Sequence, residues 1–508
     1  MSPATSQTPV NDALRRAEID LSLRHPVMFF FTSGAAWLAV AILLGIVASA
    51  KTHSPDFLTG WSWLTYGRVQ SAHMNALVYG WACQAAFGAL IWLMARLSRQ
   101  ECRAAGIILV AGHVWNLAIS LGLIAILAGG GTGMPWMEFP AFAWVPMLLS
   151  YAAIAIWSMV QFKVRPAGHV FISQWYILAA LIWFPWVFAS AHLLIHAFAG
   201  NPVMAAAINA WYRSAMLLLF FVPTGIAAAY YLIPKVTGRP VYSYSLSALG
   251  FWSLAIIAPW AGMQKLAGAP IPNFLPYLGA AATILFAVPC IAVGVNLLKT
   301  AAGAPETVAN SPSLHFTIMG VFGLLILGAA SVFLNNPAIL PGTQFSMANY
   351  GFDILGVYGF FSFIAFGVIY FVVPRITRRE WLSSRLIKMH FFLSLYGVAL
   401  VVIVALFGGA MQGIGLEDYK MPAEDASMRA YPYAVATTLA WCFLLFSNVF
   451  FFFHLTLMWL RLGRRSSHPT LLGVHHADDL HDAAHGPEGD IDNGGPGTVH
   501  PDSHAHSH

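Results

Sequence analysis

Residues 343–375 read TQFSMANYGFDILGVYGFFSFIAFGVIYFVVPR. Between Asp353 and Arg375 this stretch carries no charged side chain, and it is as long as the roughly 20 apolar residues that a helix needs to cross a bilayer. In lipid every backbone polar group must be satisfied within the protein, which favours a helix over an isolated strand. The stretch therefore predicts a transmembrane helix over residues 348–374.

Eleven further stretches of this kind occur along the 508 residues. The whole chain is 58% hydrophobic and only 9% charged, whereas a soluble protein carries about 25% charged residues. We therefore predict an all-α membrane protein of about twelve transmembrane helices. The predicted spans are 28–50, 72–97, 104–127, 139–161, 173–199, 210–235, 246–266, 274–298, 314–334, 348–374, 388–412 and 432–462.

Charge places both termini on the same side of the membrane. Most of the 25 Lys and Arg flank the predicted helices on the side of the N-terminus, as the positive-inside rule requires of cytoplasmic loops. These basic residues lie in short flanks and form no continuous stripe, which argues against a nucleic-acid partner and leaves the lipid bilayer as the main one. We expect three parts: a cytoplasmic N-terminal segment (1–27), a twelve-helix membrane domain (28–465) and a disordered, His-rich cytoplasmic tail (466–508).

Three further stretches are distinctive: WLTYGRVQSAHMNALVYGW (63–81), YYLIPKVTGRPVYSY (230–244) and LGVYGFFS (355–362). They resemble subunit I of the heme–copper oxidase superfamily, in the branch of the cytochrome cbb-type oxidases and nitric-oxide-reductase-like proteins. The resemblance implies a heme–copper oxidase subunit I-like bundle in the bacterial inner (cytoplasmic) membrane. It also implies six histidine ligands, on helices two, six, seven and ten, for two hemes and copper B.

Only one of these ligand positions keeps its histidine, which is His73 on helix two, in AHMNA. Helices six, seven and ten carry other residues where the resemblance places the remaining ligands. These residues are Ser214, Gln264, Lys265, Phe352 and Ile354. One imidazole cannot build a bis-histidine heme, so we expect neither heme nor copper B; a heme b bound through His73 is the alternative.

Three charged residues, Arg213, Lys265 and Asp353, stand at or beside the replaced positions near one end of their helices. Charges at such depth are costly and usually pair or face a wet cavity. We expect Asp353 to pair with Arg213 or Lys265 and to fill space that the cofactors would take, although both cations could instead extend separately to the interface.

Other histidines offer weaker metal sites. His192 and His196 stand at i and i+4 in AHLLIH, a spacing that can place both on one metal. The tail ends in HPDSHAHSH, and its His504, His506 and His508 could bind a transition metal. In both places hydrogen-bonded or solvated histidines without metal remain the alternative.

Three functions fit this sequence. The favoured one is a non-catalytic paralogue of subunit I, which assembles as a structural or regulatory subunit with other respiratory-complex membrane or cytochrome c-type subunits. The second is a divergent cytochrome c oxidase or nitric oxide reductase subunit I with a rearranged heme site around His73, His192 and His196. The third is transport or metal handling, using the emptied cofactor cavity and the His-rich tail.

Overall fold

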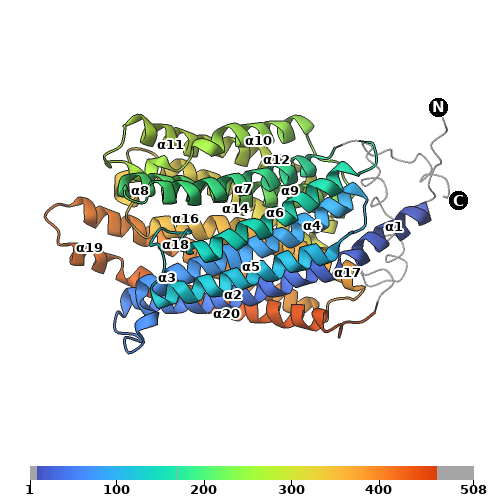
Figure 1. Ribbon diagram of the computed structural model, residues 1–508, viewed down its shortest axis with the longest axis horizontal. Helices are drawn as coiled ribbons and strands as arrows, with labels where there is room; N and C mark the ends of the chain where they lie inside the picture. Colours follow the sequence, from blue (N-terminus) through green and yellow to red (C-terminus); the bar gives the residue numbers. More distant parts are fainter. Residues whose placement is uncertain (1–8, 169, 466–508) are drawn as a thin grey trace.

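The computed structural model describes residues 9–168 and 170–465, which form one elongated bundle of helices (Figure 1). Within these residues twelve helical spans are long and apolar enough to cross a membrane, as the sequence predicts. The spans are α2 (Arg24–His53), α3 to α4 (Tyr66–Ser98), α5 (Ala105–Ala128), α6 (Ala141–Lys163), α7 (Ile172–Ala197), α8 to α9 (Pro202–Thr237), α10 and the turns after it (Tyr244–Leu266), α11 to α12 (Phe274–Ala302), α14 (Pro312–Leu334), α16 to α17 (Ala348–Thr377), α18 (Ser384–Glu417) and α20 (Tyr431–Trp459). Four shorter helices accompany them: α1 (Pro9–Ser22), α13 (Pro305–Asn310), α15 (Leu340–Thr343) and α19 (Ala423–Arg429).

Three spans make up the centre of the bundle. The most apolar part of each is wholly buried in protein, whereas the other nine spans are 33% to 56% buried and expose the rest. Each central span also contains a π-helical segment, a widened turn that is frequent at functional sites. These segments are η2 (Ala76–Ala82) between α3 and α4, η3 (Leu217–Phe221) between α8 and α9, and η6 (Leu355–Ser362) between α16 and α17.

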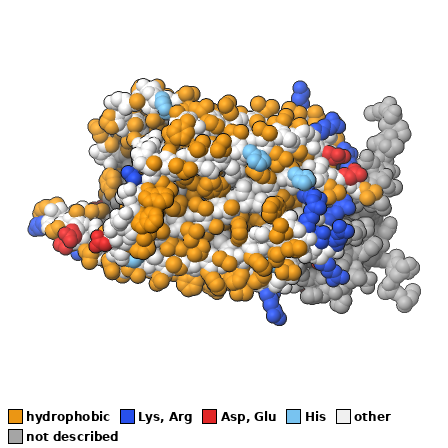
Figure 2. Space-filling model, turned by 60° about the horizontal axis from the view of Figure 1, so that its bottom comes forward, with side chains coloured by type: hydrophobic (Ala, Val, Ile, Leu, Met, Phe, Trp, Pro, Cys, Tyr) orange, Lys and Arg blue, Asp and Glu red, His pale blue; other side chains and the backbone are white. Residues whose placement is uncertain are grey.

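The two ends of the bundle differ in charge. On the face that Figure 2 shows, apolar side chains cover the middle of the molecule, and most Lys and Arg gather at one end. This basic end holds α1 and the C-terminal end of α20, while α3, α8 and α19 lie toward the opposite, far end (Figure 1). An apolar girdle between two polar ends is what a bilayer-spanning protein requires.

The N-terminal segment contains a helix that the sequence analysis did not predict. Helix α1 ends at Ser22, and α2 begins at Arg24, four residues before the expected boundary. Asp20, near the end of α1, is buried and accepts a hydrogen bond from Trp92 Nε1 at 2.9 Å. The same carboxylate forms an ion pair with Arg96 at 3.3 Å. Because both partners lie on the central helix α4, α1 is fixed to the basic end of the bundle.

The seventh span differs from the continuous helix predicted over 246–266. Helix α10 (Tyr244–Ile257) ends early and is followed by two 3₁₀ turns, Ala258–Trp260 and Met263–Leu266. Gly262 lies between the turns with φ of 114°, a value that favours glycine. A Cβ at Gly262 would lie 2.5 Å from the Ala210 carbonyl oxygen, so only glycine lets this segment press against α8. Gln264 and Lys265 therefore stand on a short turn and not on an α-helix.

Candidate functional site

The one retained histidine uses both of its ring nitrogens within the protein. His73 is fully buried on α3, and its Nδ1 lies 2.7 Å from the Ala41 carbonyl oxygen, which can only accept a hydrogen bond. Nδ1 therefore carries the proton, and Nε2 is left to accept one from the Tyr350 hydroxyl, 3.2 Å away. A metal needs that same Nε2 lone pair, so the Tyr350 hydroxyl stands where a ligand bond would form.

Neighbouring aromatic rings hold this arrangement in place. Trp441 Nε1 donates to the Tyr350 hydroxyl at 2.8 Å, and the Trp441 ring packs edge-on against His73 with centroids 4.8 Å apart. A Cβ on Gly45 of α2 would lie 2.7 Å from His73 Cε1. The imidazole is thus closely packed, and Ile354, at a replaced ligand position, is fully buried and offers no donor atom.

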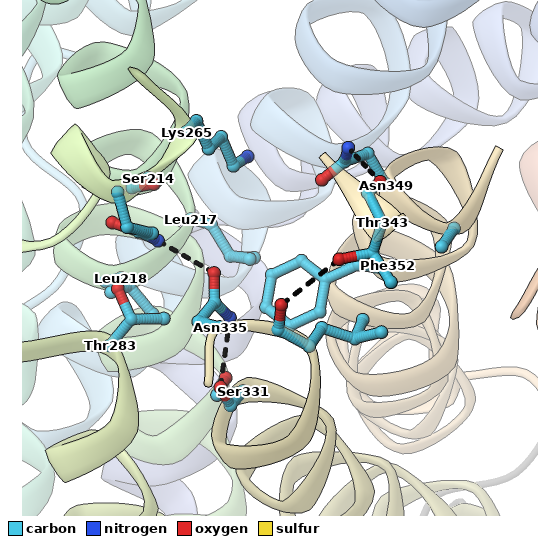
Figure 3. A pocket seen from close by; sticks show the side chains of 13 residues that line it. Ser214, Leu217, Leu218, Lys265, Thr283, Ser331, Asn335, Thr343, Asn349 and Phe352 are labelled. Carbon is cyan, nitrogen blue, oxygen red and sulfur yellow. Dashed lines mark hydrogen bonds between the residues drawn. The ribbon is translucent and has the colours of Figure 1, made fainter. Parts of the chain in front are cut away.

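Four of the five replaced positions on helices six, seven and ten, all except Ile354, come together around one small pocket (Figure 3). Its lining includes hydroxyl and amide groups, one ammonium group and an apolar wall. These groups come from Ser214, Gln264, Lys265, Thr283, Ser331, Asn335, Thr343, Asn349, Leu217, Leu218, Leu334, Ala348 and Phe352. The space open to the centre of a water molecule is about 20 Å³, which is enough for roughly one water.

The amides at the base of the pocket satisfy one another. Gln264 Oε1 accepts from the Gly262 backbone N–H at 2.8 Å, and Gln264 Nε2 donates to Asn335 Oδ1 at 2.9 Å. Asn335 Nδ2 in turn donates to the Ser331 carbonyl oxygen at 3.0 Å. A fully paired amide network of this kind is rigid and specific, because each buried polar atom would be costly if left unpaired.

The ion pair expected between Asp353 and Arg213 forms. Arg213 on α8 and Asp353 on α16 make a direct salt bridge, with side-chain exposures of 19% and 8%. Lys265 is half-buried beside them, and its ammonium group makes no hydrogen bond or ion pair within residues 9–168 and 170–465. The charge cluster expected from the sequence therefore consists of a direct Arg213–Asp353 ion pair and of Lys265, which stands apart from that pair.

A buried acid that the sequence analysis missed completes the site. Glu138 lies in the loop between α5 and α6, is only 4% exposed, and accepts a hydrogen bond from Asn75 Nδ2 at 2.6 Å. Burial raises the pKa of Glu138 from 4.5 to about 7, although hydrogen bonds from Asn75 and Ser71 and the Arg213 charge act in the opposite direction. The only sequence signal is its place in WMEF, an acid among large apolar residues directly before a helix.

The His192 and His196 pair does come together, on one face of α7. Each Nδ1 bonds a backbone carbonyl one turn earlier: His192 to Phe188 at 2.9 Å and His196 to His192 at 2.8 Å. Both rings pack against Trp144, with centroids 4.8 and 5.8 Å away. Among the described residues no group of three His, Cys, Asp or Glu could hold a metal ion, and metal binding by this pair stays a prediction. The tail histidines His504, His506 and His508 lie outside the described residues.

The donor set at the centre does not suit the heme and copper that the resemblance implies. A protonated lysine has no lone pair to offer a metal, hydroxyl and amide groups are weak ligands for copper, and Phe352 and Ile354 have none at all. Pockets for cofactor-sized molecules run to several hundred Å³, far above the space at this centre. The residues present therefore do not fit a heme–copper centre.

Comparisons with known proteins support the architecture. The chain is 23% identical over 403 residues to a cytochrome c oxidase subunit 1 homolog of Azorhizobium caulinodans, covering 74% of this chain and 70% of that protein. It is 24% identical over 397 residues to the Cbb3-type cytochrome c oxidase subunit CcoN1 of Stutzerimonas stutzeri, covering 74% and 81%. The cryo-EM structure of a heme-copper terminal oxidase dimer matches with a TM-score of 0.70 at 14% identity and covers 90% of both chains, which shows the fold.

The family assignment rests on most of the chain. Residues 25–443 match the family Cytochrome C and Quinol oxidase polypeptide I, a range that begins at α2 and ends inside α20. The chain is therefore a member of the heme–copper oxidase subunit I family.

Proposed function

We propose that this chain is a non-catalytic membrane subunit that assembles with respiratory or denitrification partners and binds neither heme nor copper. The observation that carries this proposal is that both ring nitrogens of His73 already make hydrogen bonds within the protein. Its Nε2 accepts from Tyr350 where a heme iron would bind, and the five other ligand positions hold residues that suit no such centre. The Arg213–Asp353 salt bridge lies beside the replaced positions Ser214 and Phe352, and it places two paired charges where the resemblance implies metal ligands.

Cofactor content is the direct test. The detergent-purified chain should give a flat reduced-minus-oxidised spectrum, no pyridine hemochrome and no stoichiometric copper or iron. Stoichiometric heme that disappears in His73→Ala would refute the proposal and support the rearranged oxidase or reductase. Metal analysis should be repeated on a chain truncated after residue 465, so that metal held by the tail is not counted as a resident cofactor.

Partner subunits are the second part of the proposal. The relatives named above are cytochrome c oxidase subunits, which supports a place for this chain in a similar assembly. Affinity purification from native membranes should recover membrane or cytochrome c-type subunits in fixed ratio. A chain that runs alone after mild solubilisation, and whose deletion leaves every respiratory complex intact, would refute a structural role.

We also propose that the basic end faces the cytoplasm of a bacterial cell, which places both termini inside. The gathering of Lys and Arg at that end supports this orientation (Figure 2). Reporter fusions at the two termini should be active only when the reporter functions in the cytoplasm. A periplasmic signal from either fusion would refute it.

A further inference from the structure

The pocket at the replaced metal positions has an excess of positive charge. Arg213 is neutralised by Asp353 in a direct salt bridge. Lys265 has no such partner among the described residues; the charged groups whose fields reach it are Arg213, which repels it, and Asp353, which attracts it. Glu138 accepts a hydrogen bond from Asn75, and no ion pair joins it to Lys265 within the described residues. The ammonium group is therefore only partly compensated.

The Lys265 ammonium reaches into the pocket. In Figure 3 its side chain extends across the top of the cavity, toward the side on which Asn349 lies. Ser214 also lines the cavity, and its hydroxyl makes no hydrogen bond within the described part of the chain. Two hydrogen-bond donors, one of them charged, thus remain available in a cavity whose amides Gln264 and Asn335 are already engaged with each other.

The size of the cavity limits what these donors can bind. About 20 Å³ is open to the centre of a water molecule, more than the roughly 10–15 Å³ that one water needs, so the cavity suits one particle slightly larger than water and not a carboxylate-bearing metabolite or a phosphate ester. A cation would be repelled by Lys265. A small anion would gain charge-assisted hydrogen bonds and would supply the counter-charge that a cation at this depth usually has.

We propose that this pocket binds one small inorganic anion of about halide size, held by the Lys265 ammonium and the Ser214 hydroxyl. The change from imidazole ligands to lysine and serine then converts a site for metal cations into a site for an anion. The proposal rests on the absence of copper from this centre, which is part of the proposed function, and it does not depend on which partners the chain assembles with.

Chloride binding by the full-length, detergent-purified chain tests the proposal. Radiolabelled chloride should bind at one saturable site per chain and should be displaced by unlabelled bromide, with gluconate keeping the ionic strength constant. Lys265→Met should weaken binding at least about tenfold, because hydrogen bonds to charged groups are among the strongest in proteins. Lys420→Met is the matched control, since Lys420 is exposed in the loop between α18 and α19 at the far end of the bundle.

Several results of the chloride-binding experiment would overturn the proposal. No saturable binding to the unmodified chain, or equal binding by Lys265→Met, overturns the proposal. Equal losses in both lysine variants also overturn it, because they indicate a general surface effect. If Lys265→Met does not fold, Ser214→Ala should lose roughly threefold to tenfold in affinity, and an unchanged affinity there refutes the assigned geometry. A heme spectrum of the same sample distinguishes failure of the proposed function from failure of the anion site.

Discussion

Replacing Glu138 by Gln should change how the stability of this protein depends on pH. Glu138 is 4% exposed and its hydrogen bond from Asn75 can be accepted equally well by a glutamine carbonyl. The substitution therefore keeps the shape and the acceptor while removing the titrating group. With the pKa raised to about 7 in the fold, the folded chain prefers the neutral acid.

The size of the effect follows from the shift in pKa. Below pH 4.5 the carboxyl is protonated in both the folded and the unfolded chain, so it does not change the free energy of unfolding. Between pH 4.5 and about 7 the unfolded chain releases the proton while the folded chain keeps it, so the free energy of unfolding falls as pH rises. Each unit of pKa shift corresponds to about 1.4 kcal/mol, which gives a loss of about 3 kcal/mol by pH 7 and no further loss above it.

Chemical unfolding in mixed micelles between pH 4.5 and 8.5 measures this loss. Glu138→Gln should match the unmodified chain at the acidic limit and exceed its stability by about 3 kcal/mol at pH 7 and above. Glu424→Gln, at an exposed acid on α19, is the control and should leave the pH profile unchanged. Parallel profiles for the unmodified chain and Glu138→Gln would refute the burial of an acid with a raised pKa.

Four other substitutions test the packing of the site by the same unfolding assay. Asp353→Ala should cost about 3–5 kcal/mol because it leaves the Arg213 charge unpaired, and Arg213→Met with Asp353→Ala should cost less than Asp353→Ala alone. Tyr350→Phe should cost about 1–3 kcal/mol because it removes the hydroxyl that bonds His73. Gly45→Ala should cost about 1–3 kcal/mol because its new methyl group would lie 2.7 Å from the His73 ring and displace it.

Matched controls separate these effects from general loss of stability. Tyr277→Phe removes the hydroxyl of an exposed tyrosine, and Gly60→Ala adds a methyl group where no atom lies within 4 Å. Both should be nearly neutral. Equal losses in test and control variants would show that the site residues are held less closely than the structure indicates.

The twelve spans were predictable because crossing a bilayer imposes a composition that can be read locally. Their ends were not, because a helix can continue past the hydrocarbon while its backbone hydrogen bonds are satisfied, and hydropathy does not mark where it stops. Helix α18, for instance, runs over Ser384–Glu417 against a predicted 388–412. The break after Ile257 was missed for another reason: hydropathy does not register that Gly262 must approach the backbone of α8.

The site was predictable only in part. A pairing of Arg213 with Asp353 could be expected from two opposite charges at similar depth in apolar helices. The bonding of His73 to Tyr350 could not, because it depends on the rotation and depth at which separate helices pack. Glu138 escaped notice because an acid in a loop looks solvent-exposed until the loop is seen to fold inward.

The π-helical segments also set the rotation between the two halves of each central helix. An α-helix turns by about 100° per residue, so removing one residue from η6 would rotate α16 by about that angle relative to α17. Asp353 would then point away from Arg213 although no side chain at the far end had been altered. The far-end halves of the three central helices carry His73, Arg213 and Asp353. In each helix the π-helical segment therefore fixes the angle at which the half that carries these side chains meets the half at the basic end.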